Sequence, residues 1–578
     1  MGVESFSLAP LDYVAIVGYF ALLSVVGFLA GRGEQASSSE YFLAGKKLPW
    51  YVVGGSFIAS NISSDHFIGM IGSAVVFGIC VSMMEWGNLF TFSLLIWFFI
   101  PFLLSAKVFT TPEYLELRFN SALRQIFAVA TILSNVVAFL AAVLYGGGLA
   151  LASLFGWDLW FSVITLGMVS GIWAIYGGLS SVAWTDLLTV AVMILGGMMV
   201  TVLGLHALAG DGGSLVDGFR VMIERNQANH GAWAEAVNAN TTHLAGGTAE
   251  NYDRLSLFQR VTHPIVPAIS FLPMVFSVGL WYNVLNQFMI QRVLGARSEY
   301  DARMGIVFAG WIKVIMPLIV VLPGLVLFGL NPEILLSPWE QVKPSADKGY
   351  VQLVQSLVPV GLRGLLLAAL FGAIQSTVNS VLNSTSTIVT LDIYKRLFRP
   401  DASDRHLVRV GVISSVIILA ISILLGRFVG ELGGSLFEYI QSLYSFFAPP
   451  FAAVFVLGIL WRRINGTGAL ATVISGFSLG IAIKLYLNYA HDPPQWLFPY
   501  SNQASINWFV CMAVCVSVSL LTAPPRAEQV TDQLTFNWKK MNIFSNLGDH
   551  WYSSVTTWWG LFAITILALF TLFSGFFL

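Results

Sequence analysis

Residues 49–78 read PWYVVGGSFIASNISSDHFIGMIGSAVVFG, an apolar run with a polar insert at its centre. The run is long enough to cross a bilayer, because a hydrocarbon layer of about 30 Å takes about 20 residues of helix. The insert at 60–66 carries Ser, Asn and Asp side chains that compete with a helix for backbone hydrogen bonds. We therefore expect a spanning helix that unwinds halfway and frees backbone carbonyls at a depth where binding sites form.

The rest of the chain is just as apolar. Of its 578 residues, 56% are hydrophobic and 10% are charged, whereas a soluble domain has roughly 25% charged residues. The formal net charge is -1, and no arginine-rich stripe appears, so nucleic acid is not an expected partner. The lipid bilayer is the expected environment.

Apolar runs bounded by charge or by Pro and Gly clusters predict an all-α polytopic protein with about fourteen spans. An even number of spans places both termini on one side. If the termini lie outside, the short inner loops collect most of the Lys and Arg residues, as the positive-inside rule requires. The expected spans are 12–30, 49–78, 80–104, 121–152, 158–176, 183–207, 263–290, 304–329, 358–391, 407–427, 432–460, 466–487, 505–522 and 557–577.

Two charges within the expected spans stand out, Glu85 and Lys313. A charge at mid-membrane costs at least about 2.5 to 3.5 kcal/mol, so it usually faces a cavity or a partner. The alternatives are a structural ion pair, or snorkelling from a helix end. We favour a cavity-lining role.

A second interruption, GLWYNVLNQ at 279–287, comes five spans after the first. Interruptions at corresponding places indicate two five-helix halves of inverted topology with a binding site between them. This repeat is inferred from spacing alone.

The expected span 358–391 carries the heaviest hydroxyl and amide load of the chain. Helical spacing places Ser376, Thr377 and Ser380 on one face. Neutral oxygens on one face can replace the water shell of a small cation, although small polar residues also serve as helix-packing contacts. Asp186, near the inner end of another span, fits either a cation pathway or a helix cap.

Ordered motifs throughout residues 12 to 463 resemble the sodium/solute symporter family, and within it the sodium/glucose cotransporter branch. Together these motifs are specific, whereas each alone is weak. They are YFLAGK (41–46), SNISSDHFIG (60–69), TPEYLELRF (111–119), YGGL (176–179) with WTD (184–186), Gln287 with QR (291–292), LNSTST (382–387) with DIYK (392–395), and YIQS (439–442) with APP (448–450).

The resemblance implies a LeuT-type core of two inverted five-helix repeats containing two discontinuous helices. One extra helix precedes this core and three follow it. The implied organisation is an N-terminal helix and cytoplasmic loop (1–48), a first repeat (49–207), an extracellular loop (208–262), a second repeat (263–463), and three peripheral helices (464–578) with a cytoplasmic loop near 523–556.

Site residues also follow from matching positions in the family. The sodium site would use backbone carbonyls of Ala59, Ile62 and Ala373 with the hydroxyls of Ser376 and Thr377. Asp186 and Ser380 match positions that some members use for a second sodium ion. For a sugar, the resemblance implies as ligands Asn61, His66, Glu85, Lys313 and Gln441, with Asn88 adjacent, Tyr282 as the stacking residue and inner gate, and Met70 and Phe437 as the outer lid.

Two positions depart from the sugar-transporting pattern. Gly279 stands where such relatives usually have Asn or Thr, and Asn283 stands where they usually have Trp. The expected function is therefore sodium-driven import of a hexose or related polyol, with inositol or another polar metabolite as the alternative solute. A different alternative is an uncoupled, sugar-gated sensor or leak channel.

The chain offers no set of nucleophile, base and orienting group, and its eight histidines form no metal-ligand cluster in the sequence. We therefore expect no enzyme activity and no cofactor, with sodium as a co-transported ion. The expected location is a cell membrane, here a bacterial inner membrane, with both termini outside and a functional monomer.

Overall fold

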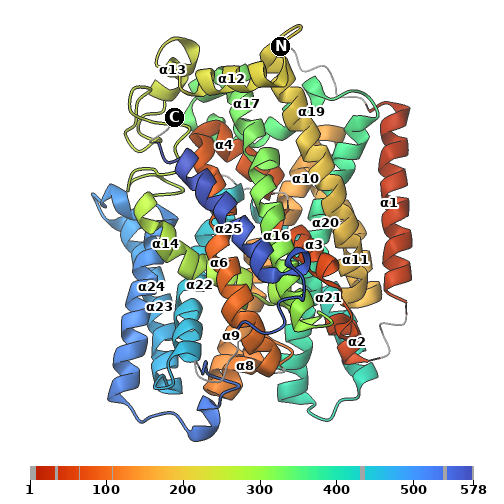
Figure 1. Cartoon of the computed structure of the whole chain (residues 1–578), viewed down its shortest axis with the longest axis vertical. Coiled ribbons are helices and arrows are strands. Elements are labelled where there is room, and N and C mark those ends of the chain that lie inside the picture. The colour runs from red at the N-terminus through yellow and green to blue at the C-terminus, as the bar shows by residue number, and fades with distance from the viewer. Residues whose placement is uncertain are drawn as a thin grey trace.

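The computed structural model describes residues 8–32, 37–63, 65–106, 108–429, 436–537 and 543–575. Over these residues the chain is helical, and its β-structure is limited to two isolated bridges. Twelve of the described helical segments are long and apolar enough to cross a membrane. Most of them run along the long axis of the molecule (Figure 1). The chain is a multi-pass membrane protein.

One helix, α20 (Leu362–Ile388), occupies the centre of the molecule. In the apolar stretch of this helical segment, 94% of the residues are buried. The helix packs against α1, α3, α11 and α21. The central elements are α3 (Trp50–Asn61), η3 (Asp65–Met70), α4 (Ile71–Phe77), α5 (Met83–Trp86), α6 (Asn88–Leu94), η6 (Ser134–Leu140), α10 (Ala141–Phe155), α11 (Leu159–Ala209), η8 (Val275–Gly279), η9 (Trp281–Leu285), α15 (Gln287–Leu294), α16 (Glu299–Val320), α17 (Leu322–Leu330), α21 (Asp404–Val429) and α22 (Leu436–Leu460).

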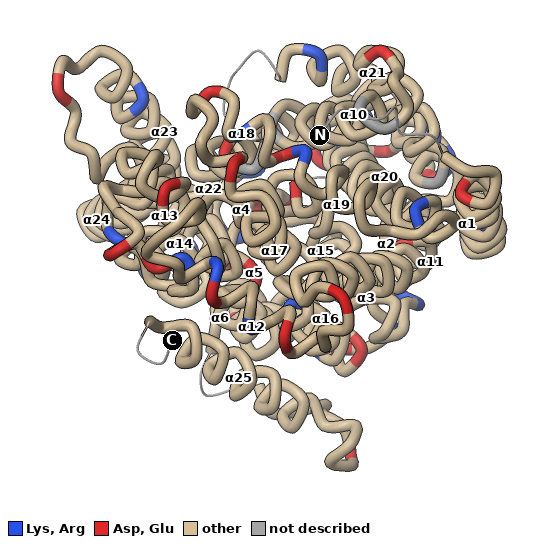
Figure 2. Tube along the Cα trace, turned by 90° about the horizontal axis from the view of Figure 1, so that it is seen from above, with Lys and Arg blue, Asp and Glu red and all other residues tan. Residues whose placement is uncertain are grey.

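Four helices lie at the edges. Figures 1 and 2 place α1 on one side of the molecule and α23 with α24 on the opposite side. A further helix, α25, packs along α16. In the apolar stretch of each of these helices, only 17% to 33% of the residues are buried. Most of each helix therefore faces lipid. They are α1 (Pro10–Ala30), α23 (Gly466–Tyr489), α24 (Tyr500–Leu521) and α25 (Val555–Leu572).

Two glycines replace loops that the sequence had predicted between spans. Within α11 the backbone bends at Gly178 (φ 55°, ψ -147°), so the expected spans 158–176 and 183–207 join without a loop. A Cβ at Gly178 would lie 2.2 Å from the carbonyl oxygen of Tyr41, so only glycine fits. Gly78, with φ 84°, makes the other bend, and the chain continues helically from there to Ala106.

Two central helices are interrupted in the membrane-spanning region. The first ends as α3 at Asn61, where Ile62 is extended (φ -91°, ψ 121°), and it resumes as the π-helical turn η3. The second ends as η9 at Leu285, where Asn286 is extended (φ -68°, ψ 125°) before α15 begins. Both breaks lie within the polar inserts at 60–66 and 279–287.

Segment 208–262 closes the end of α4. The last four carbonyls of a helix have no partner within it. The guanidinium of Arg254 donates to the carbonyls of residues 74–76 at 2.7 to 3.3 Å, and the hydroxyl of Tyr252 donates to that of Phe77 at 3.0 Å. Burial lowers the pKa of Arg254 to about 10, which leaves it charged at neutral pH. The segment therefore caps α4 completely.

The same end of the molecule gathers other long connections. The helices α12 (Leu215–Asn226) and α13 (Gly231–Asn238) lie there, at the same end of the molecule as the start of α1 and the end of α25 (Figure 1). The amide of Leu257 donates to the carbonyl of Phe573 at 2.8 Å. Residues 208–262 also contact segment 330–357, where the Asn240 side chain donates to the carbonyl of Leu335 at 2.5 Å.

Candidate functional site

A large cavity lies where the two interrupted helices meet α5, α6, α16 and α22. Its empty volume is about 900 Å³, within the range of small-molecule sites. Every residue expected to bind the solute lines it, as does Met70: Asn61, His66, Glu85, Asn88, Tyr282, Lys313 and Gln441. The side chain of Phe437, the other expected lid residue, lies outside the described part of the structure.

The side chains of Glu85 and Lys313 form an ion pair in the lining of this cavity. Lys313 Nζ lies 2.6 Å from Glu85 Oε2, and the two side chains are 1% and 3% exposed. Lys313 also donates to the side-chain oxygen of Asn61, at the break after α3. A buried ion pair repays its desolvation only with good geometry and further hydrogen bonds, and this pair has both. It ties α16 and α5 to the unwound turn.

His66 adds a second link from the unwound turn to Glu85. Its Nε2 lies 3.3 Å from Glu85 Oε1, and its Nδ1 lies 2.9 Å from Asp65 Oδ1. Asp65 lines the cavity too. In the sequence, Asp65 stands out only as part of the polar insert, although a carboxylate within a spanning segment is itself a signal of function.

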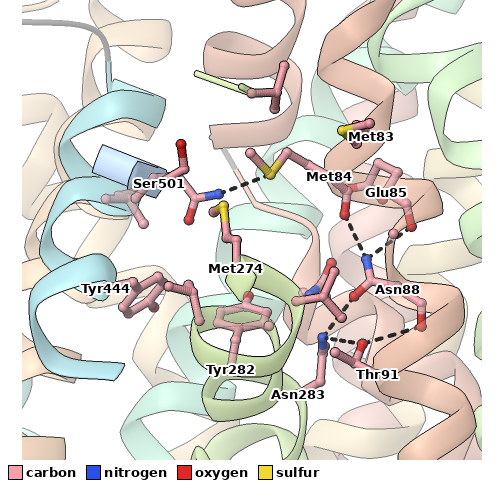
Figure 3. Close-up of a pocket in the computed structure, with 18 of the residues that line it drawn as sticks. Met83, Met84, Glu85, Asn88, Thr91, Met274, Tyr282, Asn283, Tyr444 and Ser501 are labelled. Atoms are coloured by element: carbon pink, nitrogen blue, oxygen red, sulfur yellow. Dashed lines mark hydrogen bonds between the residues drawn. The ribbon is translucent and has the colours of Figure 1, made fainter. Parts of the chain in front are cut away.

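Asn283 and Asn88 form an amide network on one wall of the cavity (Figure 3). The Asn283 amide nitrogen donates to Asn88 Oδ1 at 2.8 Å and to Thr91 Oγ1 at 3.1 Å. Asn88 in turn donates to the backbone carbonyls of Met84 and Glu85. Both donors of each amide are used, so the oxygens are fixed in orientation. Asn283 and Thr91 are therefore part of the site, and the sequence argument had given Thr91 no role.

Aromatic rings form the facing wall. The rings of Tyr282 and Tyr444 are 5.5 Å apart, and Figure 3 shows both across the cavity from Asn88. Phe139 packs edge-on against Tyr282 at 6.4 Å. Among the described residues, the Gln441 amide nitrogen has only the sulfur of Met84 as a hydrogen-bond partner, at 3.8 Å. The cavity thus offers an apolar face and an amide group that can form a hydrogen bond with a bound small molecule.

The expected sodium ligands meet where α20 passes the first helix break. The Thr377 hydroxyl donates to the carbonyl of Ile62 at 3.1 Å. The Ser376 hydroxyl donates to Asp186 Oδ1 at 2.6 Å. Ala59 and Ala373 are fully buried on α3 and α20, which pack together. Carbonyl, hydroxyl and carboxylate oxygens are the ligands that hard cations prefer.

Asp186 does not cap a helix. It lies within α11, eight residues after the bend at Gly178, and accepts hydrogen bonds from Ser376 and from Ser56, both at 2.6 Å. Of the two roles that the sequence left open for Asp186, a helix cap and a cation pathway, the structure therefore excludes the helix cap.

Arg292 is the main residue of this region that the sequence argument left without a role. It is fully buried and lies 3.9 Å from Asp186 Oδ2. It donates to Ser56 at 3.0 Å and to Ser380, and Ser380 also shares a hydrogen bond of 2.8 Å with Ser60. The motif QR at 291–292 was visible in the sequence, but nothing there paired it with Asp186.

Comparison with known proteins gives one family and several full-length relatives. The model of the sodium:solute symporter family matches residues 41–476. The sodium/glucose cotransporter of Vibrio parahaemolyticus is 34% identical over 551 residues, which cover 93% of this chain and 96% of that one. The human sodium/myo-inositol cotransporter is 34% identical over 559 residues, 92% of this chain and 76% of that one.

A solved structure shares the fold. A sodium-coupled sialic acid symporter, in a substrate-bound and outward-open state, aligns with a TM-score of 0.71 over 90% of this chain and 99% of its own. The two sequences are 21% identical, so this likeness concerns the fold alone.

Proposed function

The chain belongs to the sodium:solute symporter family, and from that premise we propose that it imports a hexose or a related polyol together with sodium by alternating access. The observation that carries the proposal is the placement of all the expected solute ligands around one cavity, adjacent to the junction of Ile62 and Thr377. The family and these relatives are transporters, and sodium is the co-transported ion.

The proposed sodium site lies between the break after α3 and the polar face of α20. Its ligands are the carbonyls of Ala59, Ile62 and Ala373 and the hydroxyls of Ser376 and Thr377. Sodium bound there would stabilise one orientation of the unwound turn, which also carries Asn61 and His66 at the solute cavity. Such coupling requires that sodium bind one state more tightly than the other.

A second sodium ion would use Asp186 and Ser380. Arg292 already brings a positive charge to both residues. A second ion therefore requires the guanidinium to withdraw, and the contacts favour one sodium in the state that the structure represents.

The cavity chemistry suits an uncharged solute with many hydroxyl groups. Amides, an imidazole and a paired carboxylate and ammonium offer fixed donors and acceptors, and hydrogen bonds to charged groups are the stronger ones. The Tyr282 and Tyr444 rings provide an apolar face for a sugar ring. Gly279 and Asn283 alter the wall relative to sugar-transporting relatives, and glucose and myo-inositol transporters are equally similar to this chain. Myo-inositol is the alternative solute.

We further propose the LeuT-type arrangement of two inverted repeats, 49–207 and 263–463, with fourteen spans and two discontinuous helices. The peripheral parts are 1–48 and 464–578, and 208–262 faces outward with both termini. The helix breaks at Ile62 and Asn286 support the repeat. A bacterial inner membrane as location and a functional monomer complete the proposal.

The membrane potential supplies much of the driving force. Moving one charge inward across 100 mV is worth about 2.3 kcal/mol, or about fiftyfold accumulation per sodium ion. An uncoupled sensor or leak channel would gain nothing from it.

Uptake by proteoliposomes tests the function and names the solute. Labelled glucose and labelled myo-inositol are supplied with an inward sodium gradient, and each is competed with a panel of sugars, inositols and amino acids. We expect hexoses or inositols to compete and amino acids not to. Competition by amino acids alone would refute the solute class.

A further inference from the structure

A small second cavity lies between α22, α23 and α24, on the face of α22 turned away from the aromatic wall. Its empty volume of about 250 Å³ is under a third of that of the solute cavity. Its polar lining includes Lys484, Ser442 and Ser445. None of these residues belongs to the proposed solute or sodium site.

Lys484 brings an unpaired positive charge to this cavity. It lies on α23, five residues before the end of that helix at Tyr489, and its Nζ donates to Ser442 Oγ at 3.0 Å. Within the described ranges Lys484 forms no ion pair. Glu438, one turn before Ser442 on α22, is paired with Lys343 at 2.5 Å. Lys484 is half-buried, and a charge without a counter-ion is costly within a membrane-spanning helix.

Two hydroxyl groups of the lining have a proton left to donate. Ser445 is 6% exposed, and its Oγ has no hydrogen-bond partner in the part of the chain that the structure describes. Ser442 Oγ accepts from Lys484, so its own proton is not used in that bond. The remaining polar residues are engaged elsewhere, since Asn507 donates to the carbonyl of Gly476 and Gln503 to that of Phe498.

We propose that this cavity binds a small inorganic anion, a halide such as chloride, between the Lys484 ammonium and the hydroxyls of Ser442 and Ser445. Positive charge, hydroxyl donors and the absence of a carboxylate from the lining together select an anion over a cation. The small volume of the cavity favours a monatomic ion over a larger one.

The bound anion would act on α22. Gln441, which directly precedes Ser442, faces the solute cavity, as does Tyr444. Neutralising Lys484 would hold α22 against α23 and α24 and so fix the position of Gln441. Halide should therefore stabilise the protein and, through α22, raise its affinity for the solute.

Thermal unfolding of the purified full chain in detergent tests the proposal independently of transport. Sodium is held constant while its counter-ion is chloride, bromide or gluconate. We expect an unfolding temperature higher by about 2 °C or more in the halides, because a ligand that binds only the folded state stabilises it. Lys484→Met should abolish this difference. Lys348→Met, which removes an exposed charge that is not part of the cavity lining, should keep it.

Ser445→Ala retains the charge and serves as the second variant if Lys484→Met does not fold; it should weaken the halide effect. Equal unfolding temperatures in all three salts, or a halide effect that survives Lys484→Met, would overturn the proposal. An anionic lipid is the other source of negative charge. If phosphatidylglycerol added in gluconate raises the unfolding temperature through Lys484 and halides do not, the site holds a lipid phosphate and the halide is excluded.

Discussion

The hydroxyl of Thr377 on α20 lies 3.1 Å from the carbonyl oxygen of Ile62, the extended residue directly after the end of α3. This contact joins a straight, buried helix to a helix that unwinds in the membrane. Asp186, which accepts hydrogen bonds from Ser376 and Ser56, lies on one side of this contact. The solute cavity lies on the other side. We propose that sodium coupling depends on that junction.

Removing the hydroxyls of Ser376 and Thr377 should weaken sodium binding. In the double alanine variant we expect the sodium concentration for half-maximal uptake to rise about tenfold or more, since each lost ligand is worth about 1 kcal/mol. Solute affinity at saturating sodium should change little. Ser386→Ala is a matched control, because that buried hydroxyl on α20 bonds only to the carbonyl of Asn383. An unchanged sodium requirement would mean that sodium binds elsewhere.

Variants of Glu85 and Lys313 should affect the stability of the protein and its binding of solute in different ways. Removing either partner leaves a buried charge and should cost about 3 to 5 kcal/mol of unfolding free energy. The double variant Glu85→Gln with Lys313→Met should recover most of that stability yet still fail to bind solute. Thermal unfolding and solute binding on the same samples measure both effects. Recovery of binding as well would leave the pair a structural role only.

Gln441→Ala should weaken solute binding by about tenfold, the worth of one good hydrogen bond. The amide has only a sulfur neighbour at 3.8 Å, so its loss removes no strong internal contact. The sodium requirement at saturating solute should stay as in the wild type. Gln495→Ala, at an exposed position, is the control. If uptake kinetics are unaltered, Gln441 does not touch the solute.

Arg254→Met should destabilise the protein without changing which solute and ion it binds. The substitution keeps much of the side-chain volume but removes the partner of the carbonyls of Val75 and Val76, at about 1 to 3 kcal/mol for each group that water cannot reach. We expect a lower unfolding temperature and faster proteolysis of segment 208–262. Arg220→Met, an exposed substitution in the same segment, should have no such effect. Equal stability of the two variants would show that the end of α4 needs no cap.

Most of the fold follows from patterns that the sequence displays directly. Apolar runs mark spanning helices because lipid offers no partner for free backbone groups, and polar inserts mark breaks because their side chains replace helical hydrogen bonds. The bends at Gly178 and Gly78 could not be foreseen. Each depends on the close approach of a distant backbone, that of Tyr41 or Arg254.

The candidate site was predictable where a residue is costly at its depth or matches a family motif. Glu85 and Lys313 were visible as charges within apolar runs. Thr91 and Arg292 were not assigned, because their roles arise from partners far away in the chain. Asp65 was not assigned although its contact with His66 is local. The contact of Arg292 with Asp186 joins α15 to α11, and a single sequence carries no signal for such a pairing.

Uptake of the labelled solute into proteoliposomes with and without an inward sodium gradient, at the same total sodium, tests the central claim most directly. We predict accumulation above the external concentration only with the gradient, increased by an inside-negative potential and abolished in the Ser376→Ala, Thr377→Ala variant. Equal uptake under both conditions, reaching no more than the external concentration, would contradict sodium-coupled import.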